Sequence, residues 1–414
     1  MKILYLNDDF PPKSFGGAGI VVYNLAKTVL DLGHDVYVVT TVQNKHEAGY
    51  STQGGLKVFR IYSKYHRRWR AYVSLYNPQT VKKVAQIIEE VKPDIIHIHN
   101  THFYLSYYCF KIAKKSGVPV FLTAHDVMLV NQNKIILPHT ATRDNFMRYC
   151  RMTALRQLKE FKWRYNPFRN LIIRHYVSQY TDKVFGFSYA QKKVLELNGI
   201  GNLEVIHSAI NVDAYQAIPE EVTDFKKKHG LEGKKIILFG GRISVQKGIY
   251  ETLQALKIIV KEVPNALLVV AGVGVSGFDA LGLPIKFLGW LGPEEMRLAL
   301  LVSDVVVLPS ICFDVFGMMV LEGMASKKPV IGTCFGGAPE AIEDGVTGFV
   351  VNPYNVEDMA RKLIILLEDE TLAQRFGEAG YQRVKDFFDT KAQTAKIMGW
   401  YRIVLDKNIK NKSA

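Results

Sequence analysis

Cysteines and long apolar runs are both scarce in this sequence. The four cysteines are Cys109, Cys150, Cys312 and Cys334. They form no CxxC pair and no metal-like spacing, which favours reduced thiols in a cytoplasmic protein over a disulfide framework. No apolar run reaches the length of about 18 residues that a membrane-spanning helix needs. The opening MKILYLNDDF predicts a buried strand rather than a signal peptide, because its apolar run is short and acids follow at once.

Charged residues are few, but positive charge is in excess. They make up 22% of the residues, against 48% hydrophobic residues, which is typical of a folded globular protein. The length of 414 residues predicts two or three domains. The formal net charge of +14 predicts an anionic partner: nucleic acid, a phosphorylated substrate or an acidic membrane surface. Half of this excess lies between Arg143 and Arg174, where nine basic residues face two acids, Asp144 and Glu160.

Strand-like and helix-like segments alternate along both halves of the chain. In the first half, strands are expected at 2–6, 35–41, 94–99, 118–126, 182–188 and 203–209, and helices at 19–33 and 81–92. In the second half, strands are expected at 234–241, 266–272, 285–290, 304–310, 329–333 and 348–351, and a helix at 249–264. This alternation is typical of βαβ units. We therefore predict an α/β protein with two Rossmann-like, doubly wound domains facing each other across a cleft.

The same pattern predicts the domain boundaries. An N-terminal domain covers 1–210 and contains a basic insertion at about 130–180. The polar stretch 211–233 carries no strand signal and is the natural linker to a second domain, 234–385. The last helical segment, 386–414, either closes the second domain or packs back onto the first.

Two glycine-containing loops follow predicted strands. FGGAG (15–19) leads into a helix, where glycine lets the backbone approach a ligand and the helix N-terminus favours a phosphate; a plain tight turn explains it equally well. GGRISVQKG (240–248) places Arg242 and Lys247 at the carboxyl end of the first strand of the second domain. The planar fork of arginine and the point charge of lysine together suit a diphosphate, which we favour over two solvated cations.

Two acids lie in the apolar stretch PSICFDVFGMMVLEGMASKKPV (309–330). A helix that starts near Phe316 leaves Asp314 in the preceding loop and places Glu322 inside the helix. The free N–H groups from Gly317 to Val320 would point into the same space, so that a phosphate fits on them between the two carboxylates. An ordinary N-terminal acid and a salt-bridged glutamate are the alternative interpretation.

Histidines gather at strand ends of the first domain. TAHD (123–126) places His125 at the end of one strand. In HIHNTH (97–102), alternation puts His97 and His99 on one face of a strand and leaves His102 in the loop beyond. Because no cysteine or further clustered ligand accompanies them, structural roles are favoured over a zinc site.

Taken together, these motifs resemble the retaining glycosyltransferases of family 4, which have the GT-B fold. The chain shows the family's two acids at an E-x7-E spacing after Pro-Ser, a preceding G-R-x-x-x-x-K-G and a following G-G-x-x-E loop, here within 335–351. The resemblance covers essentially the whole chain. It departs at Asp314, because the family's first acid is usually a glutamate, one methylene longer.

The resemblance implies a hexosyltransferase that moves a sugar from a nucleotide-sugar donor to an acceptor hydroxyl with retention of anomeric configuration. Cationic side chains would stabilise the leaving group, so no metal or other cofactor is expected. By resemblance, Arg242 and Lys247 would hold the donor diphosphate, and Glu322 would bind the ribose hydroxyls. The predicted catalytic residues are His125, Arg242, Lys247 and Asp314. The predicted substrate-binding residues are Gly16, Gly17, His99, Asn100, Asp126, Arg242, Lys247, Asp314, Phe316, Gly317, Met318, Met319, Val320 and Glu322.

The partners and two other functions remain open at this point. The acceptor would be a sugar, a lipid-linked molecule or a surface-polysaccharide precursor. Aromatic residues alternate with basic ones in the stretch 143–174, which suits contact with an anionic membrane. We therefore expect a cytoplasmic protein that touches the inner face of the cell membrane. Nucleic acid, which such a stretch could also bind, is not expected as a partner. A solvated helical insertion is the alternative for this stretch. An inactive nucleotide-sugar-binding module and a sugar-nucleotide epimerase of the same fold are the alternative functions.

Overall fold

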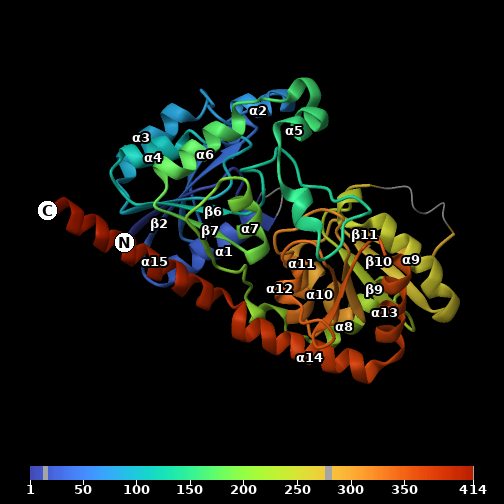
Figure 1. The fold of residues 1–414 in the computed structure, drawn as a ribbon. Helices are drawn as coiled ribbons and strands as arrows, with labels where there is room; N and C mark the ends of the chain where they lie inside the picture. Colours follow the sequence, from blue (N-terminus) through green and yellow to red (C-terminus); the bar gives the residue numbers. More distant parts are fainter. Residues whose placement is uncertain (13–16, 276–281, 414) are drawn as a thin grey trace. The chain divides into compact units, whose positions relative to one another are not determined.

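The chain folds as two compact α/β units. The computed structural model describes residues 1–12, 17–275 and 282–413, with side chains up to residue 408. Unit 1 consists of Met1–Lys134, Cys150–Ser208 and Thr390–Ala414, and unit 2 of Ile135–Tyr149 and Ala209–Asp389. The chain therefore passes from one unit to the other four times (Figure 1).

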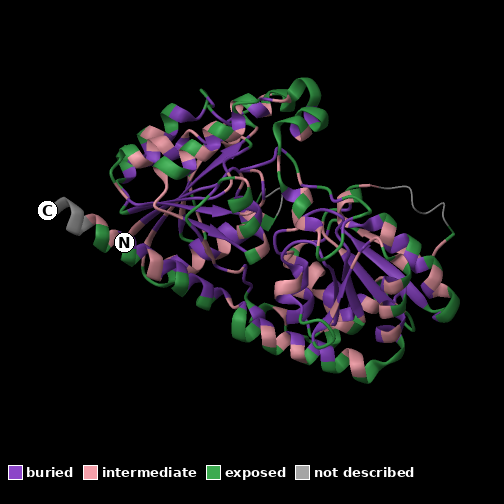
Figure 2. Ribbon diagram, viewed as in Figure 1, coloured by how far each residue is buried: buried purple, intermediate pink, exposed green. Residues whose placement is uncertain are grey.

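Unit 1 is built on an eight-stranded sheet in the order β3-β4-β2-β1-β5-β6-β7-β8. All neighbouring strands run parallel except the edge strand β3, which is antiparallel to β4. The strands are β1 (Lys2–Leu6), β2 (Asp35–Val42), β3 (Gly49–Gln53), β4 (Leu56–Tyr62), β5 (Ile95–Ile98), β6 (Val120–Ala124), β7 (Lys183–Gly186) and β8 (Leu203–Val205). The central strands are buried along most of their length, as continuous apolar runs in a covered parallel sheet should be (Figure 2).

Helices cover both faces of this sheet. The helices of unit 1 are α1 (Gly17–Asp31), α2 (Arg70–Val73), α3 (Val81–Val91), α4 (Cys109–Lys115), α5 (Ala154–Phe161), α6 (Arg169–Tyr180), α7 (Tyr189–Leu197) and α15 (Thr390–Ser413), with the 3-10 turns η1 (Lys45–Glu47), η2 (Arg67–Trp69) and η4 (Lys162–Arg164). One core joins α1 and α15 to the strands, and α3, α4 and α6 lie side by side above the sheet in Figure 1. Tyr401 of α15 is fully buried in that core, so the last helix is an integral part of unit 1.

Unit 2 is built on a six-stranded, fully parallel sheet in the order β11-β10-β9-β12-β13-β14. Its strands are β9 (Lys235–Gly240), β10 (Ala266–Ala271), β11 (Ile285–Gly289), β12 (Val305–Leu308), β13 (Val330–Thr333) and β14 (Gly348–Val351). Its helices are α8 (Pro219–Lys228), α9 (Ile249–Glu262), α10 (Pro293–Val302), α11 (Met318–Ala325), α12 (Ala338–Ala341), α13 (Val356–Glu368) and α14 (Glu370–Phe387), with the turns η5 (Val212–Tyr215) and η6 (Val245–Lys247). The strands β9 and β12 are neighbours at its centre, so the loops that follow them meet at one edge.

Two segments differ from the sequence-based boundaries. The stretch 211–233, predicted to be a linker, forms η5 and α8 of unit 2, because Phe225 and Leu231 find a core to bury in. The predicted basic insertion at about 130–180 is divided between the units, since residues 135–149 belong to unit 2. There Ile136 forms an antiparallel bridge to Cys312. The turn η3 (Phe146–Cys150) lies at the end of this segment. Its first residue, Phe146, packs on Phe313.

Candidate active site

An ion pair between Lys247 and Asp314 joins two loops of unit 2. Lys247 ends the turn η6, which follows β9, and Asp314 lies in the loop between β12 and α11. The Nζ of Lys247 donates to Oδ2 of Asp314, which also accepts a hydrogen bond from Ser310 Oγ at 3.2 Å. The two side chains are 20% and 17% exposed. Two motifs that lie 67 residues apart thus meet at the carboxyl edge of the sheet, where doubly wound folds bind ligands.

Two glycines let neighbouring loops approach the loop that carries Asp314. Gly248 has φ +80°, and a Cβ there would lie 1.9 Å from the carbonyl oxygen of Pro309. Gly336 has φ +92°, and a Cβ there would lie 1.9 Å from the carbonyl oxygen of Asp314. The N–H of Gly337 donates to the same oxygen at 2.9 Å. Asp314 is therefore held through its carboxylate on one side and through its backbone on the other.

The helix α11 begins at Met318, two residues later than expected. Gly317 adopts the left-handed conformation (φ 74°) and caps it, and the partly buried Met318 is its first residue. The side chains of Met319 and Val320 are buried in the unit, so only their backbone groups can face a ligand.

Two details of this helix start differ from the predicted substrate site. The N–H of Val320 donates to Gly317 O at 3.0 Å, so the predicted row of four free amides is wrong at its last member. The side chain of Phe316 is also buried, against Phe388. Phe316 therefore shapes the loop from inside and does not present its ring to solvent.

Glu322, in the second turn of α11, has a partner that sequence reasoning missed. Its carboxylate accepts a hydrogen bond from the hydroxyl of Tyr215 in η5. Burial raises the pKa of Glu322 to about 7, and the hydrogen bond from Tyr215 offsets part of that rise. A lone tyrosine in a polar stretch gives no sequence signal for such a contact. The carboxylate is thus positioned before any ligand arrives, with oxygen lone pairs left to accept hydroxyls.

Three further residues were predicted to contact phosphate: Arg242, Gly17 and Gly16. Arg242 lies in the loop directly after β9, with its side chain exposed. Gly17 is the exposed first residue of α1 in unit 1. Gly16 lies outside the described residues.

A pair of histidines lies at the carboxyl edge of the sheet in unit 1. His99 follows β5 and His125 follows β6, and Nδ1 of His99 lies 2.8 Å from Nε2 of His125. His97, inside β5, is fully buried and bonded to Tyr401 at 2.5 Å and Thr123 at 2.8 Å. His97 therefore has a structural role, whereas His99 and His125 lie at the carboxyl edge of the sheet, where a ligand could reach them.

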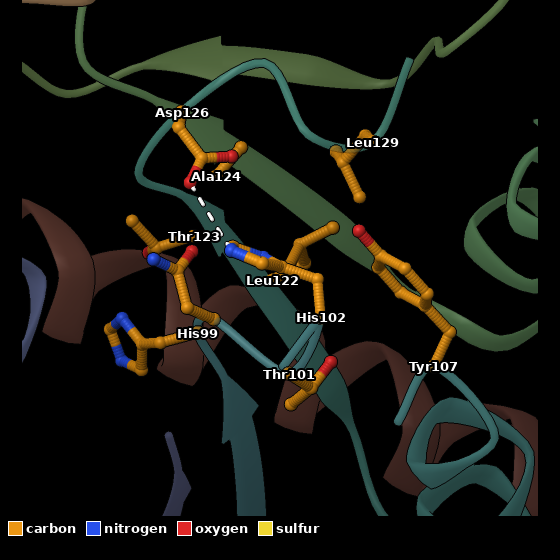
Figure 3. Close-up of a pocket in the computed structure, with 10 residues that line it drawn as sticks. His99, Thr101, His102, Tyr107, Leu122, Thr123, Ala124, Asp126 and Leu129 are labelled. Carbon is orange, nitrogen blue, oxygen red and sulfur yellow. Dashed lines mark ion pairs between the residues drawn. The ribbon is translucent and has the colours of Figure 1, made fainter. Parts of the chain in front are cut away.

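A small pocket opens beside these histidines, and Figure 3 shows its lining residues. His99, Asn100, Thr101, His102 and Asp126 contribute from the ends of β5 and β6. Three buried polar atoms in it make no hydrogen bond within the described part of the chain: His99 Nε2, Thr101 Oγ1 and His102 Nε2. His102 Nε2 approaches Asp126 Oδ2 at 3.5 Å. Buried polar atoms without partners indicate a place where a bound hydroxyl or water completes the hydrogen bonding.

The histidines at this edge are neutral. Burial lowers the pKa of His125 to about 4, that of His102 to about 4 and that of His99 well below its usual range. At pH 7 each ring therefore carries one N–H donor and one acceptor nitrogen. His125 can hold a sugar or acceptor hydroxyl by a hydrogen bond, but it does not supply a positive charge.

Metal-binding and membrane-spanning features were sought across residues 1–12, 17–275 and 282–413. Within these ranges no group of three or more His, Cys, Asp or Glu side chains is arranged to hold a metal ion. Likewise, no described helix combines the length and apolar character needed to cross a bilayer.

Comparison with known proteins assigns both units. A family model described as Glycosyltransferase Family 4 matches residues 15–214, and one described as Glycosyl transferases group 1 matches residues 221–383. The sulfoquinovosyl transferase SQD2 of Arabidopsis thaliana is 26% identical, over 90% of this chain and 68% of its own length. Among solved structures, HepE of Anabaena in complex with UDP-glucose has a TM-score of 0.71 at 19% identity, over 96% of this chain and 98% of HepE. Sucrose-phosphate synthase from Thermosynechococcus elongatus has a TM-score of 0.77 at 18% identity, over 98% of this chain and 99% of that one.

The fold class is therefore GT-B, with one Rossmann-like domain in each unit, as the sequence predicted. With one of these models matching each part of the chain, the protein belongs to the family 4 glycosyltransferases. The residues Lys247, Asp314 and Glu322 all lie in the part that matches the group 1 model.

The raised pKa of Glu322 predicts a pH-dependent stability. Because the folded protein holds this proton up to about pH 7 while the unfolded chain releases it near 4.5, stability falls as pH rises between these values. Glu322→Gln removes this loss, on the order of 1–3 kcal/mol or several degrees in Tm. Thermal unfolding at pH 5 and pH 8 measures it, with the exposed Glu357→Gln as control. The same pH dependence in wild type and Glu322→Gln would contradict the assignment.

Proposed function

We propose that this glycosyltransferase moves a sugar from a nucleotide-sugar donor to an acceptor hydroxyl with retention of anomeric configuration and without a metal ion. The observation that carries the proposal is the Lys247–Asp314 pair beside the start of α11. It places a cation, a carboxylate and helix N–H groups at one strand edge of unit 2. The UDP-glucose bound by HepE, a protein of the same fold, supports a nucleotide-sugar donor.

We propose a role for each residue of the candidate donor site. The diphosphate competes with Asp314 for Lys247, and Arg242 adds a second cation from the same loop. Released from Lys247, the Asp314 carboxylate accepts hydroxyls of the sugar, directly or through water, which compensates for its short side chain. Glu322, oriented by Tyr215, accepts the ribose hydroxyls. Positive charge at the diphosphate stabilises the negative charge that develops as the sugar departs.

The chemical step then balances as a substitution at the anomeric carbon. The bond from this carbon to the phosphate oxygen breaks, and a bond to the acceptor oxygen forms on the same face of the sugar. The proton of the acceptor hydroxyl passes to the leaving phosphate, and a nucleoside diphosphate departs. The neutral His99–His125 pair of unit 1 offers hydrogen bonds to sugar or acceptor hydroxyls and takes no proton in this scheme.

A donor panel tests this function. UDP-, GDP- and ADP-sugars are incubated with the protein and a panel of sugar and lipid-linked acceptors, in EDTA, and nucleotide release is measured. One donor should give a product with retained configuration by NMR. Lys247→Ala should lower kcat/KM by roughly 100-fold, as loss of a charge-stabilising group does.

The control for the panel is Lys257→Ala, which removes an exposed lysine of α9 in the same unit. It should leave kcat/KM unchanged. An inverted product would overturn the proposed stereochemistry, and loss of activity in EDTA would overturn metal independence. Nucleotide binding with no turnover across the panel would instead favour an inactive binding module.

We further propose that this protein is cytoplasmic and contacts an anionic membrane through unit 1. Exposed apolar side chains gather on two segments, 69–76 and 155–171: Trp69, Tyr72, Tyr76, Leu155, Leu158, Trp163, Phe168 and Leu171. A hydrogen bond from Asn166 Nδ2 to Ala71 O at 3.1 Å joins the segments, and α2 and α5 are neighbours in Figure 1. Exposed cations lie within these segments or just before them in the chain: Lys64, Arg67, Arg68, Arg151, Lys159, Lys162 and Arg164. Apolar side chains between basic ones are typical of a surface that lies on anionic lipid.

Vesicle co-sedimentation tests the membrane contact. The double variant Trp163→Ser/Phe168→Ser should bind vesicles containing phosphatidylglycerol roughly 10-fold more weakly than wild type, because two side chains lose their contact with lipid. Trp290→Ser is a matched control, since Trp290 of unit 2 is 70% exposed and Trp163 is 69% exposed. Equal binding to neutral and anionic vesicles, or equal losses in both variants, would contradict the proposal.

A further inference from the structure

Two arginines of unit 1 meet around Met128, in the loop after β6. Nη2 of Arg169, at the start of α6, donates to the carbonyl oxygen of Met128 at 2.5 Å, and Nη2 of Arg70, at the start of α2, lies 3.7 Å from its sulfur. Arg169 is 3% exposed and Arg70 is partly buried. Two like charges thus lie close enough to repel each other, and the nearby carboxylates of Asp126 and Asp8 offset part of that cost.

The two carboxylates near these arginines accept hydrogen bonds from backbone N–H groups. Asp126 accepts the N–H of Met128 at 2.7 Å, and Asp8 accepts those of Phe103, Tyr104 and Leu105 at 2.6–2.8 Å. Within the described ranges, no hydrogen bond or ion pair joins Arg70 or Arg169 to a carboxylate. Asp126 therefore attracts both arginines, and Asp8 attracts Arg70, through space rather than through a direct ion pair.

Arg70 is also held in a fixed orientation. Its guanidinium lies over the ring of Phe103, at 4.9 Å from the centroid, with Met128 at its edge. A thioether is a weak acceptor, so most of the five N–H donors of Arg70 remain for stronger acceptors. Phe103 in turn contacts the ring of His102 at 4.5 Å, and Nε2 of His102 is one of the unpartnered atoms in the pocket of Figure 3.

We propose that Arg70 and Arg169 form a subsite for a phosphate group on the acceptor. Two guanidinium forks match the charge of a phosphate monoester and its several acceptor oxygens better than they match a single hydroxyl. The guanidinium of Arg169 lies 5.8 Å from the ring centroid of Tyr107, which lines the pocket at the ends of β5 and β6, so the subsite adjoins that pocket. The inference rests on the proposed function, since it takes unit 1 to bind the acceptor. The acceptor would then be a phosphorylated molecule.

Arginine side-chain NMR tests the subsite directly. Protein labelled with ¹⁵N-arginine is titrated with methyl phosphate, with acetate as the carboxylate arm and sodium chloride as the ionic-strength control. Methyl phosphate should shift the Nε–Hε signals of Arg70 and Arg169 saturably in the millimolar range. Acetate should bind more weakly, because a carboxylate engages only one fork. Equal or tighter binding of acetate would overturn the phosphate assignment, and no saturable shift with either anion would overturn the subsite.

Variants separate this subsite from diffuse attraction of anions. Arg70→Gln should abolish the shift of Arg169, and Arg70→Lys should weaken binding roughly 10-fold, because it keeps the charge but loses the planar fork. Lys82→Gln removes an exposed charge elsewhere in unit 1 and should change nothing. Equal weakening by Lys82→Gln and Arg70→Gln would overturn the proposal. The titration contains no donor, so its failure is distinguishable from failure of the glycosyl transfer itself.

Discussion

The ion pair between Lys247 and Asp314 is the contact on which the rest of the candidate donor site depends. It fixes the loop after β9 against the loop after β12, and glycines at 248 and 336 allow the close backbone approaches that this requires. Each charge keeps the other compensated while both side chains are mostly buried. A diphosphate that replaces Asp314 at Lys247 meets a cation already in place, so little reorganisation accompanies binding.

The two units handle charge in different ways. In unit 2, charged side chains come together beside a helix start, as the binding of a diphosphate requires. At the corresponding strand edge of unit 1, burial keeps His99 and His125 neutral, and the positive charge comes from Arg70 and Arg169, which lie further along the same edge. This division suits a reaction in which one substrate brings a leaving diphosphate and the other brings a hydroxyl.

Sequence alone was sufficient for the fold class and for the positions of several candidate residues at strand ends. Strand–helix alternation predicts two doubly wound sheets, and such sheets gather ligands at their strand ends, which located Lys247, Asp314 and Glu322. Contacts between residues distant in sequence were not predictable. Tyr215 reaches Glu322 from a stretch without periodicity, and residues 135–149 join unit 2 by pairing with a loop about 175 positions later. The side-chain orientation of Phe316 depends on packing against Phe388, which no local pattern encodes.

The account predicts that Asp314 competes with the donor diphosphate for Lys247, and calorimetric titration of Asp314→Asn tests this most directly. With the nucleoside diphosphate that the wild-type protein binds, Asp314→Asn should bind several-fold more tightly, because Lys247 no longer has to leave a carboxylate. Lys247→Ala should bind more weakly in the same experiment. Weaker binding by Asp314→Asn than by wild type would show that the carboxylate supports the diphosphate rather than competing with it, and would contradict this account.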